Sequence, residues 1–208
     1  DGCVPTRVLA HAARLLREAR QFESYGLVGQ PPVVDMTALL AVTQKTIYRI
    51  HEKKQLVGHL EEVGVTVFSQ AGNAQFLDEH TITLADGTEL QGEKFILCVG
   101  GRARRLSFPG SEHALSLSDV WALKGLPRSM AVIGGAATGC QLASIFAEFG
   151  SQVWLLEVFP HLVGREDRLI SNVVEDAFRR RGIRVITHIL GVERIEKTGD
   201  GLALWYTD

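Results

Sequence analysis

The chain has 208 residues, of which 46% are hydrophobic, and its 22 basic and 24 acidic side chains give a formal net charge of −2. A chain of this size and composition can bury one large core or two modest ones. The near balance of charge argues against a nucleic-acid surface or a polybasic membrane anchor. No apolar run approaches the roughly 20 residues of a membrane span, and the first residues lack the features of a secretory signal, so we expect a cytoplasmic protein without a membrane span.

The spacing of cysteine and histidine does not indicate a metal centre. Cys3, Cys98 and Cys140 are too far apart in sequence for a CxxC pair, and the seven histidines show no zinc-ligand spacing. We therefore expect no metal site. Cys98 and Cys140 stand in apolar surroundings and are expected to be small, buried side chains.

Two helices are predicted in the first third of the chain. An apolar stripe runs through residues 8–19, with Pro5 near the first helical positions. After a Pro-Pro break, Asp35 is a suitable N-cap for a long helix over residues 36–62. The pattern then changes to strands.

Alternation with a period of two predicts a small antiparallel meander from residues 65–68, 81–84 and 89–90. Phe95 to Val99 form a continuous apolar run that ends in Gly100 and Gly101. Such a run is typical of a strand buried on both faces, and the glycines allow a close backbone approach.

Residues 104–127 contain a Pro-Gly turn, several serines and one predicted short helix at 118–123. We place the domain junction in this segment, which gives predicted domains of residues 1–119 and 120–208.

A glycine-rich stretch follows the apolar strand predicted at 131–133 and precedes a helix predicted at 142–149. It consists of Gly134, Gly135, Ala136, Ala137, Thr138, Gly139, Cys140 and Gln141. Glycines at such a strand-to-helix turn let the helix N-terminus face a pyrophosphate. Ala136 stands where the motif would have glycine, so we expect a slightly tighter pocket.

Glu157 completes this pattern, because it lies 23 residues after Gly134 at the tip of the strand predicted at 152–156. A carboxylate there accepts both ribose hydroxyls and repels a 2′-phosphate, which favours NAD(H) over NADP(H). A helix over residues 167–181, a strand at 183–187 and a hairpin turning at 199–201 are predicted to follow.

Four motifs in order resemble the flavin-dependent pyridine nucleotide-disulfide oxidoreductases, the group of dihydrolipoyl dehydrogenase, glutathione reductase and mercuric reductase. They are the segment Gly2 to Arg7, the triplet Gly72-Asn73-Ala74, the segment Cys98 to Arg102, and the glycine-rich stretch with Glu157. The resemblance implies an α/β fold: an incomplete FAD-binding domain with an antiparallel β-meander, followed by an incomplete Rossmann-like NAD-binding domain. It also implies that the chain is an internal fragment of a longer protein.

The resemblance assigns roles to individual residues. Cys3 would be the second, flavin-proximal cysteine of a CxxxxC redox disulfide, whose partner would lie three residues before Asp1. A cysteine at a helix N-terminus suits this role, since the helix dipole favours a thiolate. Backbone contacts to FAD would come from Gly72, Ala74, Val99, Gly100 and Gly101, and Ile189 would lie beside the NAD adenine.

Two positions depart from the pattern of many family members. Arg7 replaces a lysine that contacts the flavin, and Gln141 replaces the glutamate that pairs with this lysine. The charge near the flavin becomes more positive by about one unit, because arginine keeps the positive charge while glutamine is neutral. We expect a flavin that is reduced more readily than in members with the Lys-Glu pair.

The implied function is transfer of electrons between NAD(H), FAD and a redox disulfide that contains Cys3, with a small-molecule disulfide, dithiol or other acceptor as substrate. The complete protein would be a homodimer. Two alternatives remain open: a disulfide-free NAD(P)H:quinone reductase or transhydrogenase-like flavoenzyme, and, for the fragment alone, a non-catalytic dinucleotide-binding module.

Overall fold

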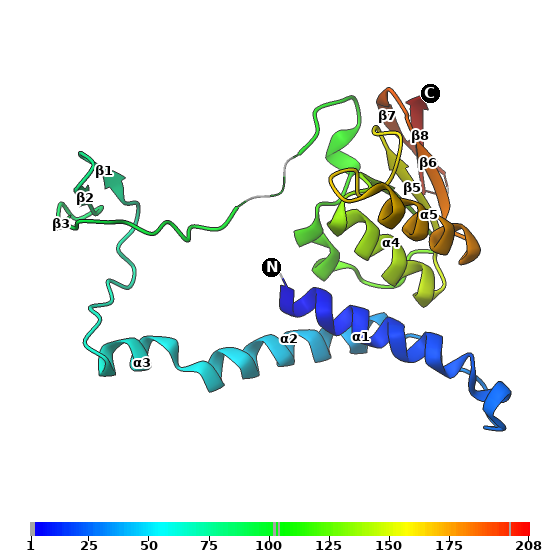
Figure 1. Ribbon diagram of the computed structural model, residues 1–208, viewed down its shortest axis with the longest axis horizontal. Helices are drawn as coiled ribbons and strands as arrows, with labels where there is room; N and C mark the ends of the chain where they lie inside the picture. Colours follow the sequence, from blue (N-terminus) through cyan, green and yellow to red (C-terminus); the bar gives the residue numbers. More distant parts are fainter. Residues whose placement is uncertain (1–2, 102, 104, 200) are drawn as a thin grey trace. The chain divides into compact units, whose positions relative to one another are not determined.

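The computed structural model describes residues 3–101, 103, 105–199 and 201–208 (Figure 1). The chain divides into two compact units, the first formed by Asp1–Ile47 with Ala103–Asp208 and the second by Tyr48–Arg102. The domain boundary expected near residue 119 stays a prediction. Residues 1, 2, 102, 104 and 200, which include parts of two sequence motifs and of the hairpin turn, lie outside the described residues.

The first unit contains a three-stranded parallel sheet with crossover helices. Its elements, in chain order, are β4 (Ser129–Ile133), α4 (Ala137–Phe149), β5 (Gln152–Glu157), α5 (Arg168–Arg180) and β6 (Arg184–Thr187). The strand order is β4-β5-β6. The predicted α/β fold is confirmed, although α4 begins at Ala137 rather than at residue 142.

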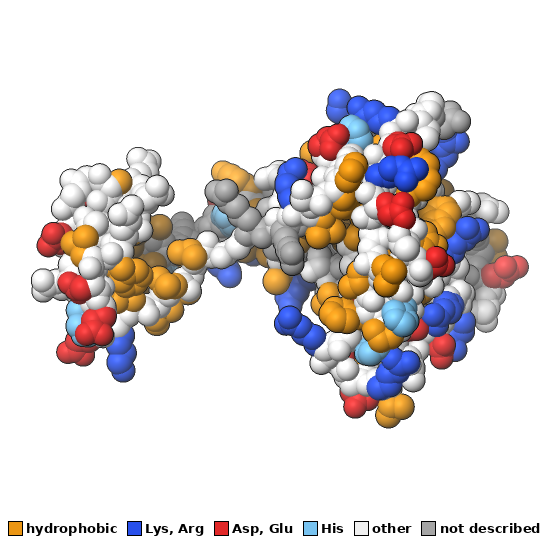
Figure 2. Space-filling view, turned by 90° about the horizontal axis from the view of Figure 1, so that it is seen from above, with side chains coloured by type: hydrophobic (Ala, Val, Ile, Leu, Met, Phe, Trp, Pro, Cys, Tyr) orange, Lys and Arg blue, Asp and Glu red, His pale blue; other side chains and the backbone are white. Residues whose placement is uncertain are grey.

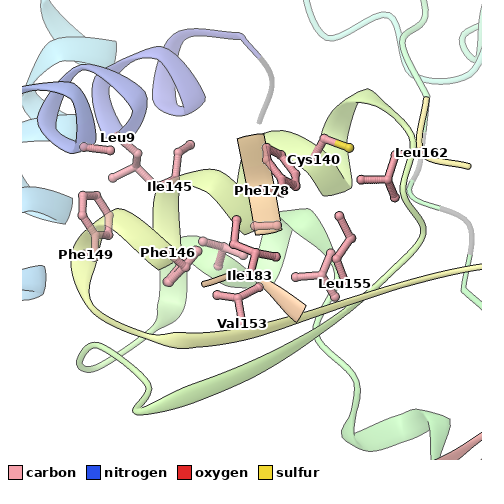
Figure 3. Close-up of a cluster of buried hydrophobic side chains, with 14 of the residues drawn as sticks. Leu9, Cys140, Ile145, Phe146, Phe149, Val153, Leu155, Leu162, Phe178 and Ile183 are labelled. Carbon is pink, nitrogen blue, oxygen red and sulfur yellow. The ribbon is translucent and has the colours of Figure 1, made fainter. Parts of the chain in front are cut away.

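Helix α1 (Cys3–Ala19) confirms the helix predicted from the apolar stripe, and it packs against α4 within the same unit. Leu9 of α1 is fully buried and lies beside Ile145 and Phe149 of α4 (Figure 3). The same core includes residues of the sheet, of α4 and α5, and of the segments that join them: Val132, Cys140, Ala143, Phe146, Val153, Leu155, Leu162, Phe178 and Ile183. Burial of this apolar surface, at about 25 cal/mol per Å², stabilises the unit.

An ion-pair cluster fixes the end of α1 to the end of α4. Glu148 is only 5% exposed, and its Oε2 accepts a hydrogen bond of 2.7 Å from Arg20 Nη1. Arg20 Nη2 also donates to the backbone oxygen of Glu148 at 2.6 Å. Arg17 and Arg181 lie 4.0 and 3.9 Å from Glu148 Oε1. The buried carboxylate therefore has the charged partners that its burial requires.

The remaining elements of the first unit are short helices and a hairpin. The 3₁₀ helices are η1 (Phe22–Tyr25), η2 (Ser111–His113) and η3 (Leu117–Ala122), and η3 begins with a capping box between Ser116 and Asp119. It confirms the short helix predicted at 118–123. The predicted hairpin is also present, as β7 (Gly191–Thr198) paired with β8 (Gly201–Thr207).

The single long helix predicted over 36–62 is wrong, because the chain forms α2 (Met36–Lys54) and α3 (Leu56–Glu62). Gln55 interrupts them with a left-handed backbone (φ 36°). Side chains from 51 to 66 are all exposed, so no tertiary packing holds one continuous helix together here. The predicted N-cap is confirmed, since Asp35 Oδ1 accepts a hydrogen bond from the Ala38 amide at 3.0 Å.

The second unit contains the predicted meander, with β1 (Gln75–Phe76), β2 (Thr81–Thr83) and β3 (Glu89–Gln91) in antiparallel order. Its first strand is β1 and not residues 65–68, which form no regular structure. In the register of β2 with β3, Ile82 pairs with Leu90.

The buried strand predicted at 95–99 is also wrong. These residues form no strand, and Ile96 and Val99 are each 89% exposed. A strand is buried on both faces only when neighbouring strands and covering helices supply the contacts, and in the described part of the chain none pairs with this segment. Cys98 is accordingly exposed rather than buried. Figure 2 shows hydrophobic side chains on the surface of the molecule.

Among the described residues, no helix is both long enough and apolar enough to cross a membrane.

Candidate functional site

The glycine-rich turn lies where β4 ends and α4 begins. Gly134 has φ 104°, a left-handed value that favours glycine, and its amide donates to the Leu156 carbonyl at 2.8 Å. The turn thus stays attached to the neighbouring strand β5 while the chain reverses into α4.

Gly139 provides the close approach of helix to turn that the motif predicts, and Gly135 adds a second close approach that it does not predict. A Cβ on Gly139 would lie 1.8 Å from the Gly134 oxygen, so only glycine lets α4 pack this tightly against the turn. A Cβ on Gly135 would lie 2.4 Å from Leu162 Cδ2. Both positions therefore depend on the absence of a side chain.

Among the described residues, the amides of Ala137 and Thr138 at the start of α4 have no hydrogen-bond partner. Its N-cap, Ala136, supplies no side-chain hydrogen bond, and Ala136, Ala137 and Thr138 are exposed. Unsatisfied amides at a helix N-terminus, together with the helix dipole, favour an anion. The arrangement fits the pyrophosphate of a dinucleotide.

Glu157 lies beside this turn, at the end of β5. Its side chain is 7% exposed, Oε2 accepts a hydrogen bond of 2.6 Å from the Gly135 amide, and Oε1 accepts one of 2.9 Å from the Phe159 amide. The structure therefore brings Glu157 to the glycine turn, and it adds a structural role that the sequence did not reveal. Ile189 is buried beside them, with its amide 3.3 Å from the Glu157 carbonyl.

Cys140 is buried in the first turn of α4, as expected, and its Sγ donates to the Gly135 carbonyl at 3.2 Å. Burial, assisted by the negative charges of Glu157 and Glu175, raises the pKa of this thiol to about 11. Cys140 is therefore a neutral thiol that packs against the turn and not a nucleophile.

The predicted redox residues lie on the surface of the helices. Cys3 is the first residue of α1 and is exposed, and Arg7 lies one turn later, also exposed. Gln141 is exposed on α4. Within the described residues, Arg7 and Gln141 form no hydrogen bond with each other, and their proposed roles beside the flavin stay predictions.

The predicted FAD contacts Gly72, Ala74, Val99, Gly100 and Gly101 all belong to the second unit and are exposed. Gly72 (φ 70°) and Gly100 (φ 69°) have left-handed backbones. A Cβ on Gly72 would lie 2.6 Å from that of Ala85, whereas Gly100 and Gly101 have open space around them. Their role as FAD contacts stays a prediction.

Sequence reasoning missed the loop between β5 and α5. Residues 158–164, named the brace loop below, contact the glycine turn through Leu162 and Val163. Glu175 of α5 in turn accepts a hydrogen bond from the Leu162 amide at 3.0 Å. No residue pattern in the sequence indicated these contacts. They join segments that are distant in sequence and that come together only when the parallel sheet forms.

Two known proteins resemble the chain in sequence. A dihydrolipoyl dehydrogenase of Zymomonas mobilis is 33% identical over 192 residues, which cover 89% of this chain and 40% of that protein. A mercuric reductase of Bacillus cereus is 25% identical and is matched over 96% of this chain and 31% of its own length. The chain thus spans less than half the length of these relatives.

A similar fold is found in a solved structure, the HOCl-induced flavoprotein disulfide reductase RclA from Escherichia coli. It has a TM-score of 0.73 and 24% identity, and the match covers 99% of this chain and 43% of that one. The family model described as pyridine nucleotide-disulphide oxidoreductase matches residues 1–207. The glycine turn, its acidic partner and this match over nearly the whole sequence together show that the chain belongs to the pyridine nucleotide-disulphide oxidoreductase family.

Proposed function

We propose that the full-length protein is a flavin-dependent oxidoreductase that passes electrons between NAD(H), FAD and a redox disulfide, and from there to a small disulfide or dithiol substrate. The main support for this proposal is the hydrogen bond between Glu157 and the glycine turn, beside the N-terminus of α4. Family membership supports a flavin cofactor.

The dinucleotide would be held by backbone and one carboxylate. The amides of Ala137 and Thr138 would bind the pyrophosphate, and Glu157 would accept hydrogen bonds from the adenosine ribose. Both Glu157 oxygens already accept one amide each, but a carboxylate has further lone pairs available. The negative charge would disfavour the 2′-phosphate of NADPH, and Ile189 would line the adenine side.

Cys3 would act between the flavin and the substrate, as the flavin-proximal cysteine of the redox disulfide. When bound, FAD supplies the chemistry that side chains lack, by taking up hydride from NADH and releasing two electrons. Two electrons and two protons convert a disulfide containing Cys3 into two thiols, and the reverse reaction oxidises a dithiol. Cys3 is exposed at the start of α1, so its sulfur is accessible to a partner group.

Arg7 would set the charge beside this route. It is exposed on α1, one turn after Cys3, and Gln141 on α4 brings no compensating negative charge. We infer that this excess of positive charge makes the flavin easier to reduce. A potentiometric titration should give a lower flavin potential for Arg7→Gln than for the unchanged protein, and an equal potential would contradict the inference.

The decisive experiment is an anaerobic titration of the full-length protein with NADH, followed by visible absorbance. A long-wavelength charge-transfer band at two electrons, absent in Cys3→Ser, is expected for a thiolate against oxidised flavin. Bleaching without this band would instead indicate the disulfide-free flavoenzyme. A colourless protein that still binds NADH would indicate a dinucleotide-binding module.

Assembly as a homodimer is part of the same proposal. Sedimentation of the full-length protein measures it directly, and a monomer at micromolar concentration would contradict it.

A further inference from the structure

The brace loop touches the dinucleotide site at three points. The Phe159 amide donates to Glu157 Oε1 at 2.9 Å, and the Val163 amide donates to the Gly135 carbonyl at 2.8 Å. Between them, the Leu162 side chain is fully buried and occupies the space that a Cβ on Gly135 would need. The position of the loop therefore determines where both the carboxylate and the glycine turn lie.

The backbone of the brace loop is held in an unfavourable conformation. Val163 has φ 45°, which is rare for a β-branched residue. Such a conformation persists only where surrounding contacts enforce it. Besides the bonds to Gly135 and Glu157, the Phe159 carbonyl accepts a hydrogen bond from the His188 amide at 2.9 Å. The loop is thus fixed from several sides.

Glu175 is the side chain on α5 that anchors this loop. Its Oε1 accepts the Leu162 amide at 3.0 Å, and its Oε2 lies 3.1 Å from Arg179 Nη1 one turn later. The side chain of Glu175 is only 12% exposed. A largely buried carboxylate that also pairs with an arginine on the same helix is restricted in orientation, so the Leu162 amide that donates to it is held in place.

The geometry points to Glu175 as a positioning residue for dinucleotide binding. It acts through the Leu162 amide, which places Leu162 over Gly135 and keeps the brace loop against Glu157. Glu175 itself contacts neither the glycine turn nor Glu157 through a hydrogen bond in the described residues. This inference rests on the proposed function, because it assigns a purpose to the geometry of the proposed NADH site.

A pair of variants with similar side-chain length tests the inference in the full-length protein. Glu175→Met keeps the stem but removes the acceptor, whereas Glu175→Gln keeps an acceptor oxygen and removes the charge. The dissociation constant for NADH, measured by calorimetry, should rise about fivefold for Glu175→Met, as expected for one lost hydrogen bond. It should change less than about twofold for Glu175→Gln. Asp176→Ala, an exposed neighbour on α5, serves as the matched control.

Two further readouts separate positioning from a general loss of stability. The preference for NADH over NADPH should fall in Glu175→Met, because a displaced Glu157 no longer faces the ribose. Amide hydrogen exchange at Phe159 and Val163 should be faster in Glu175→Met than in Asp176→Ala, since the loop opens more often.

The outcomes also separate this inference from the proposed function. If the unchanged protein does not bind NADH, the proposed function fails. If the unchanged protein binds NADH and Glu175→Met binds it equally well, the positioning role is overturned. Equal weakening in Glu175→Met and Glu175→Gln would overturn the role of the acceptor oxygen and assign the effect to the charge.

Discussion

The glycine turn of the first unit and the apolar segment at 95–99 of the second have equally clear sequence patterns, but they differ in the structure. Around Gly134 the backbone bonds to Leu156, and Gly135 bonds to Glu157. At Ile96 and Val99 the side chains are exposed and no strand is formed. The first pattern finds all its partners in the described chain, between residues 129 and 189, whereas the second depends on partners that the described residues do not provide.

The two patterns differ in what they specify: the glycine-rich pattern specifies local contacts, and the apolar pattern specifies only that burial is favourable. Glycines at a strand-to-helix turn act through contacts made within a few residues or with the next strand, so a local pattern can specify them. An apolar run states only that burial is favourable, and burial requires a surface to pack against.

The largest expected effect is on the reactivity of cysteine in the two regions. In the 208-residue chain at pH 8, Cys98 should react with iodoacetamide at least about a thousandfold faster than Cys140, because Cys140 must first be exposed by opening. Peptide mass spectrometry over time measures both rates. If Cys98 reacted as slowly as Cys140, the segment at 95–99 would be buried, and the contrast between the two regions would be wrong.

A glycine from each region gives the next largest effect. Gly139→Ala should lower the free energy of unfolding by about 3 kcal/mol, since its Cβ would meet the Gly134 oxygen and force α4 away from β4. Gly101→Ala has open space around the new methyl group and should change stability by less than about 0.5 kcal/mol. Urea unfolding measures both, and a harmless Gly139→Ala would show that the helix does not approach this closely.

The packing of α1 on α4 predicts a somewhat smaller effect. Glu148→Ala should lower the free energy of unfolding by about 2 kcal/mol, because it removes the buried carboxylate that pairs with Arg20 and lies near two other arginines. The loss is moderate because the three arginines are themselves partly exposed. Glu18→Ala, which removes the exposed pair of Glu18 with Arg14, should cost less than about 0.5 kcal/mol. If thermal unfolding shows equal losses, α1 is not fixed to α4 in solution.

The smallest effect concerns the pH dependence of stability. Because the pKa of Cys140 is raised to about 11 from an ordinary value of 9.0, the folded protein keeps its proton longer than the unfolded chain does. The stability that the protonated Cys140 thiol contributes is complete below pH 9. The free energy of unfolding then falls as the pH rises through 9 toward 11, and it is lower by about 1 kcal/mol at a pH of about 10. Cys140→Ala should lack this decline in urea unfolding, and an identical decline would assign it to other groups.

The sequence predicted the fold most reliably where periodicity and end signals agreed. The Asp35 cap, the stripe of α1 and the three parallel strands are all confirmed. The helix break at Gln55 was missed, because propensity alone does not mark a left-handed residue between two helical stretches.

The candidate site divides in the same way. Gly139 and Glu157 were predicted from spacing, and the structure brings them to one turn. The roles of Leu162 and Glu175 were not predicted, because their partners lie across the loop between β5 and α5. An ordinary leucine and an ordinary helical glutamate carry no local signal of such contacts.

By itself, the sequence determined the α/β class, the place of the glycine turn, the identity of its acidic partner and the family. These properties follow from residue types at fixed spacings along one strand-turn-helix unit. Only the tertiary structure decided that both Glu157 oxygens brace the site, that Cys140 is a buried, neutral thiol, and that the apolar segment at 95–99 is exposed. Each of these depends on what lies nearby in space, which sequence spacing does not specify.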